Sequence, residues 1–318
     1  MKHYIGVDLG GTNIAAGIVT ADGTLLHKDS VPTGSARGYE SVLADMAELC
    51  RKIIADSGID PASVVGIGVG SPGFCDEENG VIVFAGNLHF QDVPIRAILG
   101  QEMGLPVYLA NDANCAALGE STAGAARDSS SSVTITLGTG VGSGIVIDKK
   151  ILSGAFGGAG EIGHTSLIYG GALCTCGRLG CWEAYASATA LIAQAKAAVE
   201  KHPESRILAL ADGDANRITG KVVFDAADEG DCVAETVIAE YLCYVAAGLA
   251  NTINTLQPDT IVLGGGICAQ GDRILAPIRE EVVKEVFGGE LKTKLVIATL
   301  GNDAGIIGAA MLALEEKQ

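Results

Sequence analysis

Basic residues are scarce in this chain of 318 residues, which has 21 Lys and Arg against 38 Asp and Glu and a formal net charge of −17. Binding to the phosphates of nucleic acids or to anionic membranes requires clustered positive charge. The composition therefore argues against both as partners. With 48% hydrophobic residues the chain is typical of globular proteins, and its length predicts about two domains.

Leader sequences and clean membrane-spanning runs are also lacking. No apolar stretch separates Met1 from the β-like run that starts at Tyr4. The longest uncharged stretches, 129–147 and 241–258, are interrupted by polar residues and glycine, so we expect both to be buried core elements. Nine cysteines, three of them between 174 and 181, favour a reducing compartment and a metal site over a disulfide framework. We expect a soluble, cytoplasmic protein.

Two familiar nucleotide-binding motifs are missing or incomplete. The run 68–73 matches the letters of G-x-G-x-x-G, but residues 74–80 are turn-like and do not open the helix that a dinucleotide site needs. The pair Gly220-Lys221 is followed by Val222 and lacks the upstream glycine spacing of a Walker A loop. We therefore reject both a Rossmann dinucleotide site and a P-loop.

Glycine is abundant, with 44 residues, and most of the excess directly follows short β-like runs. Backbone N–H groups after such strands are a common place to bind phosphates. Helix-like patterns separate these units at 39–57, 114–124, 188–201, 231–256, 272–286 and 304–316. Because strands alternate with helices, the sequence predicts an α/β fold.

The first glycine unit combines a carboxylate with small polar side chains. Asp8 ends a β-like run and is followed by Gly10, Gly11, Thr12 and Asn13. Such a hairpin can offer N–H groups and a hydroxyl to phosphates while the carboxylate holds Mg²⁺ through water, although an ordinary tight hairpin has the same pattern. Further phosphate and nucleoside contacts are expected from Gly138, Thr139, Gly140, Gly264 and Gly265. The units together predict an ATP and magnesium site.

Four potential metal ligands are crowded into one segment: His164, Cys174, Cys176 and Cys181. Three thiolates and an imidazole complete a tetrahedral zinc site, and a closed set of four ligands is usually structural. Chance clustering of cysteines is the alternative. Gly177 and Gly180 provide the turns that convergence of the ligands needs, so we predict a structural zinc site.

Asp112 has two interpretations. It follows a β-like run and opens a predicted helix, where Asp and Asn are favoured as N-caps. Alternatively it is a general base that the helix dipole keeps ionised. Local sequence alone favours the cap.

Taken together, these motifs resemble the ROK family of sugar kinases and sugar-responsive repressors. The resemblance covers essentially the whole chain, and its most specific part is the segment 174–183. It implies an actin-like and hexokinase-like fold of two ribonuclease-H-like lobes, with a small lobe at 1–115 plus 304–318 and a large lobe with the zinc loop at 116–303. The repressors carry an additional DNA-binding domain before the first hairpin, which we do not expect here.

The resemblance also implies an activity, the ATP-dependent phosphorylation of a hexose at its 6-hydroxyl. Asp112 would accept the proton of that hydroxyl, and His164 would bind zinc through one ring nitrogen and the sugar through the other. The other hydroxyls would be held by Asn87, Asn111, Glu161, His164 and Glu183. Glucose is the first choice of substrate because 86–90 and 181–184 look glucokinase-like. N-acetylmannosamine, N-acetylglucosamine, fructose and allose kinases and a non-catalytic sugar sensor are the alternatives, and a homodimer or dimer of dimers is expected.

Overall fold

The first β-sheet brings the ends of three parallel strands to one edge. The computed structural model describes residues 1–315, and this sheet has the order β3-β2-β1-β4-β8. Its strands are β1 (His3–Leu9), β2 (Asn13–Thr20), β3 (Leu25–Pro32), β4 (Val64–Ser71) and β8 (Val107–Asn111). β1, β4 and β8 are parallel, with Asp8 opposite Gly70 and Ser71 opposite Asn111. The register thus places Asp8 and Asn111 near the same sheet edge.

Two further sheets complete the β-structure of the described residues. The second sheet has the order β11-β10-β9-β12-β13, and the third is a small sheet with the order β5-β6-β7. Their strands are β9 (Ser131–Leu137), β10 (Val141–Ile147), β11 (Lys150–Ile151), β12 (Thr260–Gly264), β13 (Lys294–Ile297), β5 (Phe74–Asp76), β6 (Val81–Ala85) and β7 (Phe90–Val93). Because residues 74–76 form a strand followed by a turn, no helix opens at Gly73, as expected from the sequence.

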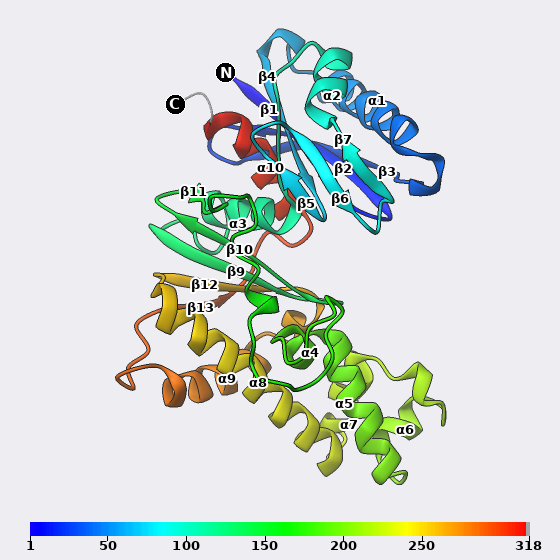
Figure 1. Cartoon of the computed structure of the whole chain (residues 1–318), viewed down its shortest axis with the longest axis vertical. Helices are drawn as coiled ribbons and strands as arrows, with labels where there is room; N and C mark the ends of the chain where they lie inside the picture. Colours follow the sequence, from blue (N-terminus) through cyan, green and yellow to red (C-terminus); the bar gives the residue numbers. More distant parts are fainter. Residues whose placement is uncertain (316–318) are drawn as a thin grey trace. The chain divides into compact units, whose positions relative to one another are not determined.

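The helices largely follow the predicted pattern (Figure 1). They are α1 (Tyr39–Ser57), α2 (Ile95–Met103), α3 (Asp112–Thr122), α4 (Glu183–Ala186), α5 (Ala188–Lys201), α6 (Arg206–Leu210), α7 (Gly220–Asp228), α8 (Cys232–Leu256), α9 (Asp272–Glu285) and α10 (Asp303–Glu315). The predictions for α1 and α5 are confirmed to the residue. α3 begins two residues earlier than predicted, and position 316 of the last predicted helix lies outside the described residues.

The first sheet is covered on both faces. Figure 1 shows α1 and α2 on one side of the sheet and α10 on the other. Side chains alternate along β1, so Ile5 and Val7 join the core beneath α1 and α2, whereas Tyr4 joins the core beneath α3 and α10. Asp8 follows Tyr4 by four residues along the strand, so both side chains lie on the face that α10 covers.

The backbone of α10 packs directly on this sheet because glycine stands at the contact points. A Cβ atom on Gly6 of β1 would lie 1.8 Å from the carbonyl oxygen of Ile306, and one on Gly68 of β4 would lie 1.7 Å from that of Ala309. Neither contact leaves room for a side chain. The position of α10 on the sheet is therefore fixed by backbone contact, with little freedom for repacking.

Gly308 of α10 makes the same kind of contact with α3, and its replacement should be strongly destabilising. Its added Cβ would lie 1.6 Å from the carbonyl oxygen of Cys115. We expect Gly308→Ala to lower the free energy of unfolding by roughly 3 kcal/mol. In Gly100→Ala of α2 the new Cβ meets only atoms at 3.5 Å or more, so that control should gain up to about 1 kcal/mol of helix propensity. Urea denaturation of both variants tests this, and similar changes would contradict it.

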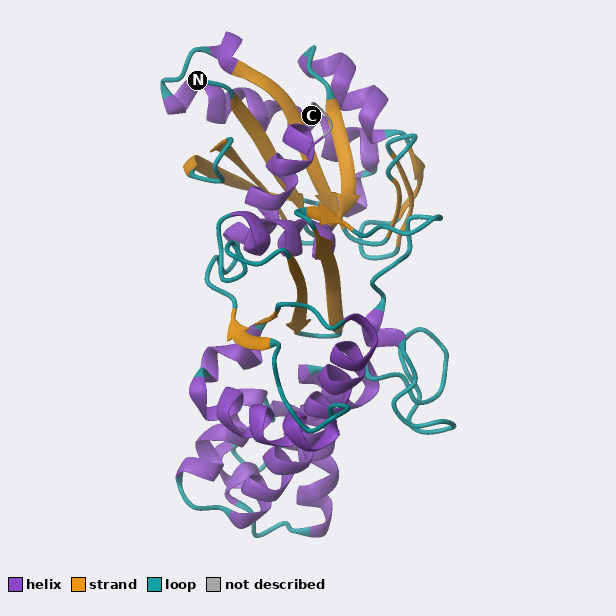
Figure 2. Cartoon of the chain, turned by 90° about the vertical axis from the view of Figure 1, so that its left-hand side faces the viewer, coloured by secondary structure: helices purple, strands orange, loops and turns teal. Residues whose placement is uncertain are grey.

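The long helix α8 lies at the centre of a group of packed helices. Among the described helices, α8 alone has the length and apolar composition of a membrane span. However, its residues Tyr241, Val245 and Leu249 are fully buried, and it packs against α5, α7 and α9. Figure 2 shows these helices gathered side by side (purple). α8 is thus a core helix, as predicted for residues 241–258.

The chain divides into two compact units at positions that differ from the predicted boundary. Unit 1 consists of residues 1–134, 143–160 and the described residues from 298 onward, and unit 2 of residues 135–142 and 161–297. The predicted small lobe stopped at 115 and resumed at 304. The difference arises because α3 packs tightly on α10 and so belongs with the first sheet.

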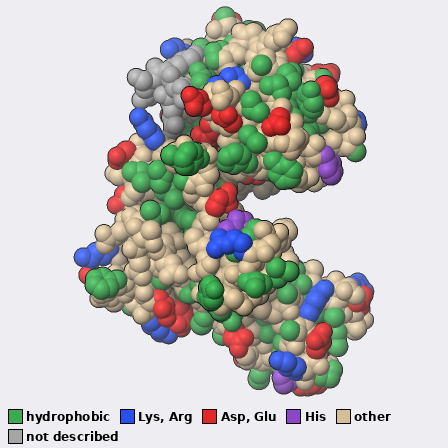
Figure 3. Space-filling view, in the orientation of Figure 1, with side chains coloured by type: hydrophobic (Ala, Val, Ile, Leu, Met, Phe, Trp, Pro, Cys, Tyr) green, Lys and Arg blue, Asp and Glu red, His purple; other side chains and the backbone are tan. Residues whose placement is uncertain are grey.

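On the face drawn in Figure 3, basic side chains of the described residues stand in small groups among acidic and apolar ones.

Candidate active site

The hairpin between β1 and β2 is held in shape by hydrogen bonds. Gly10 N–H donates to the carbonyl of Asn13 (3.0 Å), and the buried Thr33 hydroxyl donates to the carbonyl of Gly10 (2.6 Å). Thr12 and Asn13 remain exposed. The hairpin is therefore preformed, with its tip free to meet a phosphate. No pattern in the sequence indicated the bracing role of Thr33.

Asp8 and Asp112 are two mostly buried carboxyl groups within electrostatic reach of each other. Burial first, and the neighbouring Asp112 second, raise the pKa of Asp8 from 3.8 to about 6. Burial also raises the pKa of Asp112, against the opposing effect of its hydrogen bond from Ala113 N–H (2.8 Å). Desolvation outweighs this hydrogen bond and is the dominant influence on the pKa of Asp112. A raised pKa makes Asp112 a stronger proton acceptor than an ordinary aspartate.

Asn111, and not Asp112, is the N-cap of α3. Its Oδ1 accepts hydrogen bonds from the N–H groups of Ala113 (2.8 Å) and Asn114 (3.4 Å), while its Nδ2 donates to the carbonyl of Gly73 (3.1 Å). The interpretation of Asp112 as the helix cap is therefore wrong. Because the neighbouring amide satisfies the helix end, the carboxylate of Asp112 is available for other chemistry.

Asn87 lies beside the first hairpin, in the turn between β6 and β7. It is exposed, and a Cβ added to Gly11 would lie 3.2 Å from its Nδ2. The predicted site residues of unit 1 are thus close together: Asp8, the hairpin 10–13, Asn87, Asn111 and Asp112.

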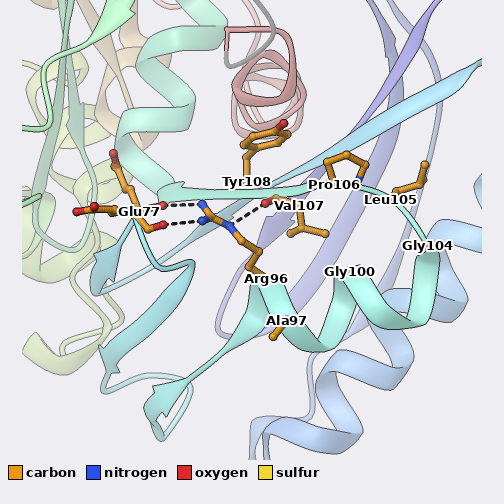
Figure 4. A pocket seen from close by; sticks show the side chains of 10 residues that line it. Glu77, Arg96, Ala97, Gly100, Gly104, Leu105, Pro106, Val107 and Tyr108 are labelled. Carbon is orange, nitrogen blue, oxygen red and sulfur yellow. Dashed lines mark hydrogen bonds between the residues drawn. The ribbon is translucent and has the colours of Figure 1, made fainter.

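Arg96 supports the segments that carry these predicted site residues, and it lines a cavity of about 700 Å³ (Figure 4). Its guanidinium donates to the backbone carbonyls of Val107 (3.0 Å), Glu78 (2.6 Å) and Glu77 (2.6 Å). These bonds tie the turn after β5 to the start of β8, the strand that ends at Asn111. Arg96 could not be predicted from the sequence, because its partners are backbone groups that no sequence pattern marks.

Because the pKa of Asp8 is raised, we expect the free energy of unfolding of the metal-free, nucleotide-free protein to fall as the pH rises. A carboxyl whose pKa is higher in the folded state favours folding while protonated, and this contribution is lost as the pH rises through about 6. The loss approaches about 3 kcal/mol, at 1.36 kcal/mol per pKa unit. Asp8→Asn should therefore unfold like wild type near pH 4 and be more stable above pH 6.5. Parallel stability curves in denaturant titrations would contradict this.

The glycine turns of unit 2 are also held by backbone bonds. Gly138 N–H donates to the carbonyl of Gly140 (3.0 Å), and the first turn of α5 contacts the same segment through Ala188 N–H to Gly138 (2.8 Å) and the Thr189 hydroxyl to Thr139 (2.8 Å). The turn after β12 contains Gly264 and Gly265, and Gly265 has φ +90°. These are the sharp turns after strands that the glycine pattern predicts.

Glu183 connects the glycine turn at 138–140 (the second glycine turn) to the loop at 174–181 (the cysteine loop). It is 8% exposed; its Oε2 accepts a hydrogen bond from Val141 N–H (3.0 Å), and its Oε1 accepts one from the Thr175 hydroxyl (2.7 Å). Although burial acts to raise the pKa of Glu183, these bonds hold it below its usual value. Its residue type and position predict only sugar binding, because the partners in these hydrogen bonds lie far from it in the sequence or on the backbone.

The four predicted metal ligands converge in unit 2. The candidate ligand atoms of His164, Cys174, Cys176 and Cys181 all lie within 4.8 Å of one another. Tetrahedral zinc with bonds of about 2.3 Å to sulfur and about 2.0 Å to nitrogen places two sulfurs about 3.8 Å apart and sulfur and nitrogen about 3.6 Å apart. The Cys176 and Cys181 sulfurs are 3.7 Å apart, and the Cys174 sulfur lies 3.6 Å from Nδ1 of His164. The donor set is therefore compatible with zinc.

The loop that carries these ligands is internally braced. Gly177 and Gly180 have φ of +85° and +84°, as their predicted turn roles require. Arg178 donates to the carbonyl of His164 (2.9 Å). With Nδ1 of His164 toward the sulfurs, its Nε2 is left for another partner. Glu161, which precedes this histidine by three residues, is exposed.

Comparison with known proteins places the chain in a family. The model of the ROK family matches residues 4–316. The chain belongs to the ROK family. It is 40% identical to a glucokinase of Halalkalibacterium halodurans, over 99% of this chain and 96% of that one.

Solved structures of ROK proteins have the same fold. A ROK family glucokinase from Streptomyces griseus, in complex with glucose and AMPPNP, is 37% identical, covers 98% of this chain and 99% of its own, and superposes with a TM-score of 0.80. A ROK hexokinase from Thermus thermophilus is 36% identical, with 99% of each chain covered and a TM-score of 0.86. The predicted family and its α/β hexokinase-like fold are confirmed.

Proposed function

We propose that this ROK protein is an ATP-dependent glucokinase that forms glucose 6-phosphate. The proposal rests on Asp112: it is mostly buried, its pKa is raised, and the helix end beside it is capped by Asn111. A carboxylate in that state suits a general base better than a structural cap. The similarity to glucokinases over nearly the whole chain supports the same activity.

In the proposed reaction, Asp112 accepts the proton of the sugar's 6-hydroxyl as that oxygen attacks the γ-phosphorus of ATP. The bond from the γ-phosphorus to its bridging oxygen breaks, and ADP leaves. The residues that orient the other hydroxyls are Asn87, Asn111, Glu161, His164 and Glu183. A site whose polar groups pair with hydroxyls should discriminate strongly against sugars that lack them.

The phosphates of ATP meet backbone groups in this proposal. The residues assigned to them are Gly10, Gly11, Thr12, Asn13, Gly138, Thr139, Gly140, Gly264 and Gly265. Asp8 would hold Mg²⁺ through water; when bound, the ion neutralises charge on the transferred phosphoryl group. The mostly buried carboxyl of Asp8 suits this role, because a nearby cation favours its ionised form and offsets its desolvation.

Zinc is proposed as a structural ion bound by His164, Cys174, Cys176 and Cys181. Its role is to fix the ring of His164 and, through the cysteine loop, the position of Glu183. A role in phosphoryl transfer is not proposed, since four protein ligands leave no open coordination position.

A coupled assay of ADP release over a dozen hexoses and N-acetylhexosamines tests the function. We expect glucose to give the highest kcat/KM and 6-deoxyglucose to give no turnover, because it lacks the attacked hydroxyl. If N-acetylmannosamine exceeds glucose, the substrate is wrong and the kinase class stands. If no sugar elicits ADP release, a sugar-sensing role replaces catalysis. The cytoplasmic homodimer that the resemblance implies is tested by fractionation and light scattering.

A further inference from the structure

Glu120 is a buried carboxylate with an unusually complete set of hydrogen-bond donors. It lies on α3 and is 1% exposed. Its Oε1 accepts hydrogen bonds from the N–H groups of Thr299 (3.0 Å) and Leu300 (2.9 Å). Its Oε2 accepts one from Ala125 N–H (2.8 Å) and lies 3.4 Å from the Thr299 hydroxyl. Burying a carboxylate is costly unless it is fully hydrogen-bonded. Glu120 therefore holds α3 firmly to the segment that contains Thr299 and Leu300.

The segment that Glu120 holds leads directly into α10. Leu300 accepts a hydrogen bond from Asp303 N–H (3.1 Å) at the start of that helix. Gly305, in the first turn, lies against Asp8: a Cβ added to it would be 2.8 Å from Asp8 Oδ2. The start of α10 is therefore in contact with one carboxylate of the proposed site.

The other carboxylate, Asp112, is the first residue of α3, the helix that carries Glu120. The same two helices meet again where Gly308 touches the backbone of Cys115. Helix α3 thus carries Asp112, and helix α10 contacts Asp8. Glu120 holds α3 to the segment that leads into α10. All of these contacts lie within unit 1.

We propose that Glu120 is a positioning residue that sets the separation of Asp8 and Asp112 for phosphoryl transfer. It touches neither substrate nor reacting atoms and acts through the α3–α10 contact. The inference rests on the proposed function, in which these two carboxylates have roles. Displacement by about 1 Å can lower a rate about 100-fold, so a loosened fastening should reduce turnover.

Asp231 provides a matched control for a purely structural effect. It is 8% exposed and caps α8 in unit 2. It accepts hydrogen bonds from the Ser205 hydroxyl (2.8 Å) and from the N–H groups of Val233 (2.7 Å), Ala234 (3.1 Å) and Arg206. Asp231 is thus also a buried carboxylate with several donors, but no proposed site residue contacts it in those bonds.

The experiment compares Glu120→Gln with Asp231→Asn in glucose phosphorylation, well below both melting temperatures and per folded molecule. We expect both variants to melt earlier. Glu120→Gln should lower kcat about 10- to 100-fold with the glucose KM changed less than about threefold, whereas Asp231→Asn should keep wild-type kcat. Equal kcat values in the two variants overturn the proposal.

A second variant keeps the test decisive if Glu120→Gln does not fold. Thr299→Val removes one contact to Oε2 and leaves the backbone donors in place, so a smaller loss in kcat, about three- to tenfold, is expected; wild-type kcat overturns the proposal. Asp112→Asn separates the two hypotheses. If it is inactive while the Glu120 and Thr299 variants keep full kcat, only the positioning role fails. If Asp112→Asn is fully active, or if the wild-type protein phosphorylates no sugar, the proposed function fails and the positioning role fails with it.

Discussion

Asp112→Asn is expected to lower kcat for glucose phosphorylation by roughly 10²- to 10⁴-fold, the usual contribution of a positioned general base. An amide cannot accept the proton of the 6-hydroxyl as its oxygen attacks phosphorus. The fold should be unaffected, because Asn111 and not Asp112 caps α3, and because the amide oxygen can still accept the hydrogen bond from Ala113. Glucose affinity should change little, since one hydrogen bond to the hydroxyl can be kept.

Three measurements on this variant test the assignment: the melting temperature, the glucose Kd and kcat. Asp231→Asn makes the same chemical change at another buried carboxylate and should leave kcat unchanged. A folded Asp112→Asn protein that retains more than about a tenth of wild-type kcat would remove Asp112 from the mechanism.

Removal of the metal site should have the second large effect. We expect the purified protein to contain about one zinc per chain and Cys181→Ser to lose it, together with about 4 kcal/mol or more of stability. Cys181 is fully buried, whereas Cys243 is exposed on α8, so Cys243→Ser should retain both metal and stability.

The same substitution should weaken glucose binding by about 10- to 100-fold. Glu183 joins the cysteine loop to the second glycine turn through hydrogen bonds with Thr175 and Val141. Collapse of the loop would therefore displace both Glu183 and the glycine turn. Elemental analysis and calorimetric titration with glucose measure the two effects. Protein that is free of zinc after purification without chelators, yet binds glucose normally, would refute the metal site.

The elements of the fold could be predicted where the signal is local. Strand followed by glycine located β1, β4, β9 and β12, and helical periodicity located α1 and α5 to the residue. The small sheet β5-β6-β7 was missed because strands of three to five residues carry little periodicity. The boundary between the two units differs from the predicted lobe boundary for a different reason. It depends on contact between α3 and α10, which are far apart in the sequence.

The candidate site shows the same division. The four candidate metal ligands could be predicted because they lie close together in the sequence and because three Cys and one His are a typical donor set for zinc. The braces Thr33, Arg96 and Glu120 were not found, because each acts on backbone groups of a distant segment. The raised pKa of Asp112 also depends on burial, which only the tertiary structure reveals. Sugar contacts stay predictions for all five residues to which they are assigned: Asn87, Asn111, Glu161, His164 and Glu183.

The position of α10 in the chain has a consequence for synthesis on the ribosome. Tyr4 and Val19 belong to a core that is closed by Ile306 and other residues of α10. At about 5–20 residues per second, the sheet waits roughly 15–60 s for the helix that covers it. Unit 2, whose segments are all made before α10, can complete its core earlier. Of the two units, the one whose strands are made earlier thus completes its core later, and in the meantime its apolar sheet face is exposed to chaperones.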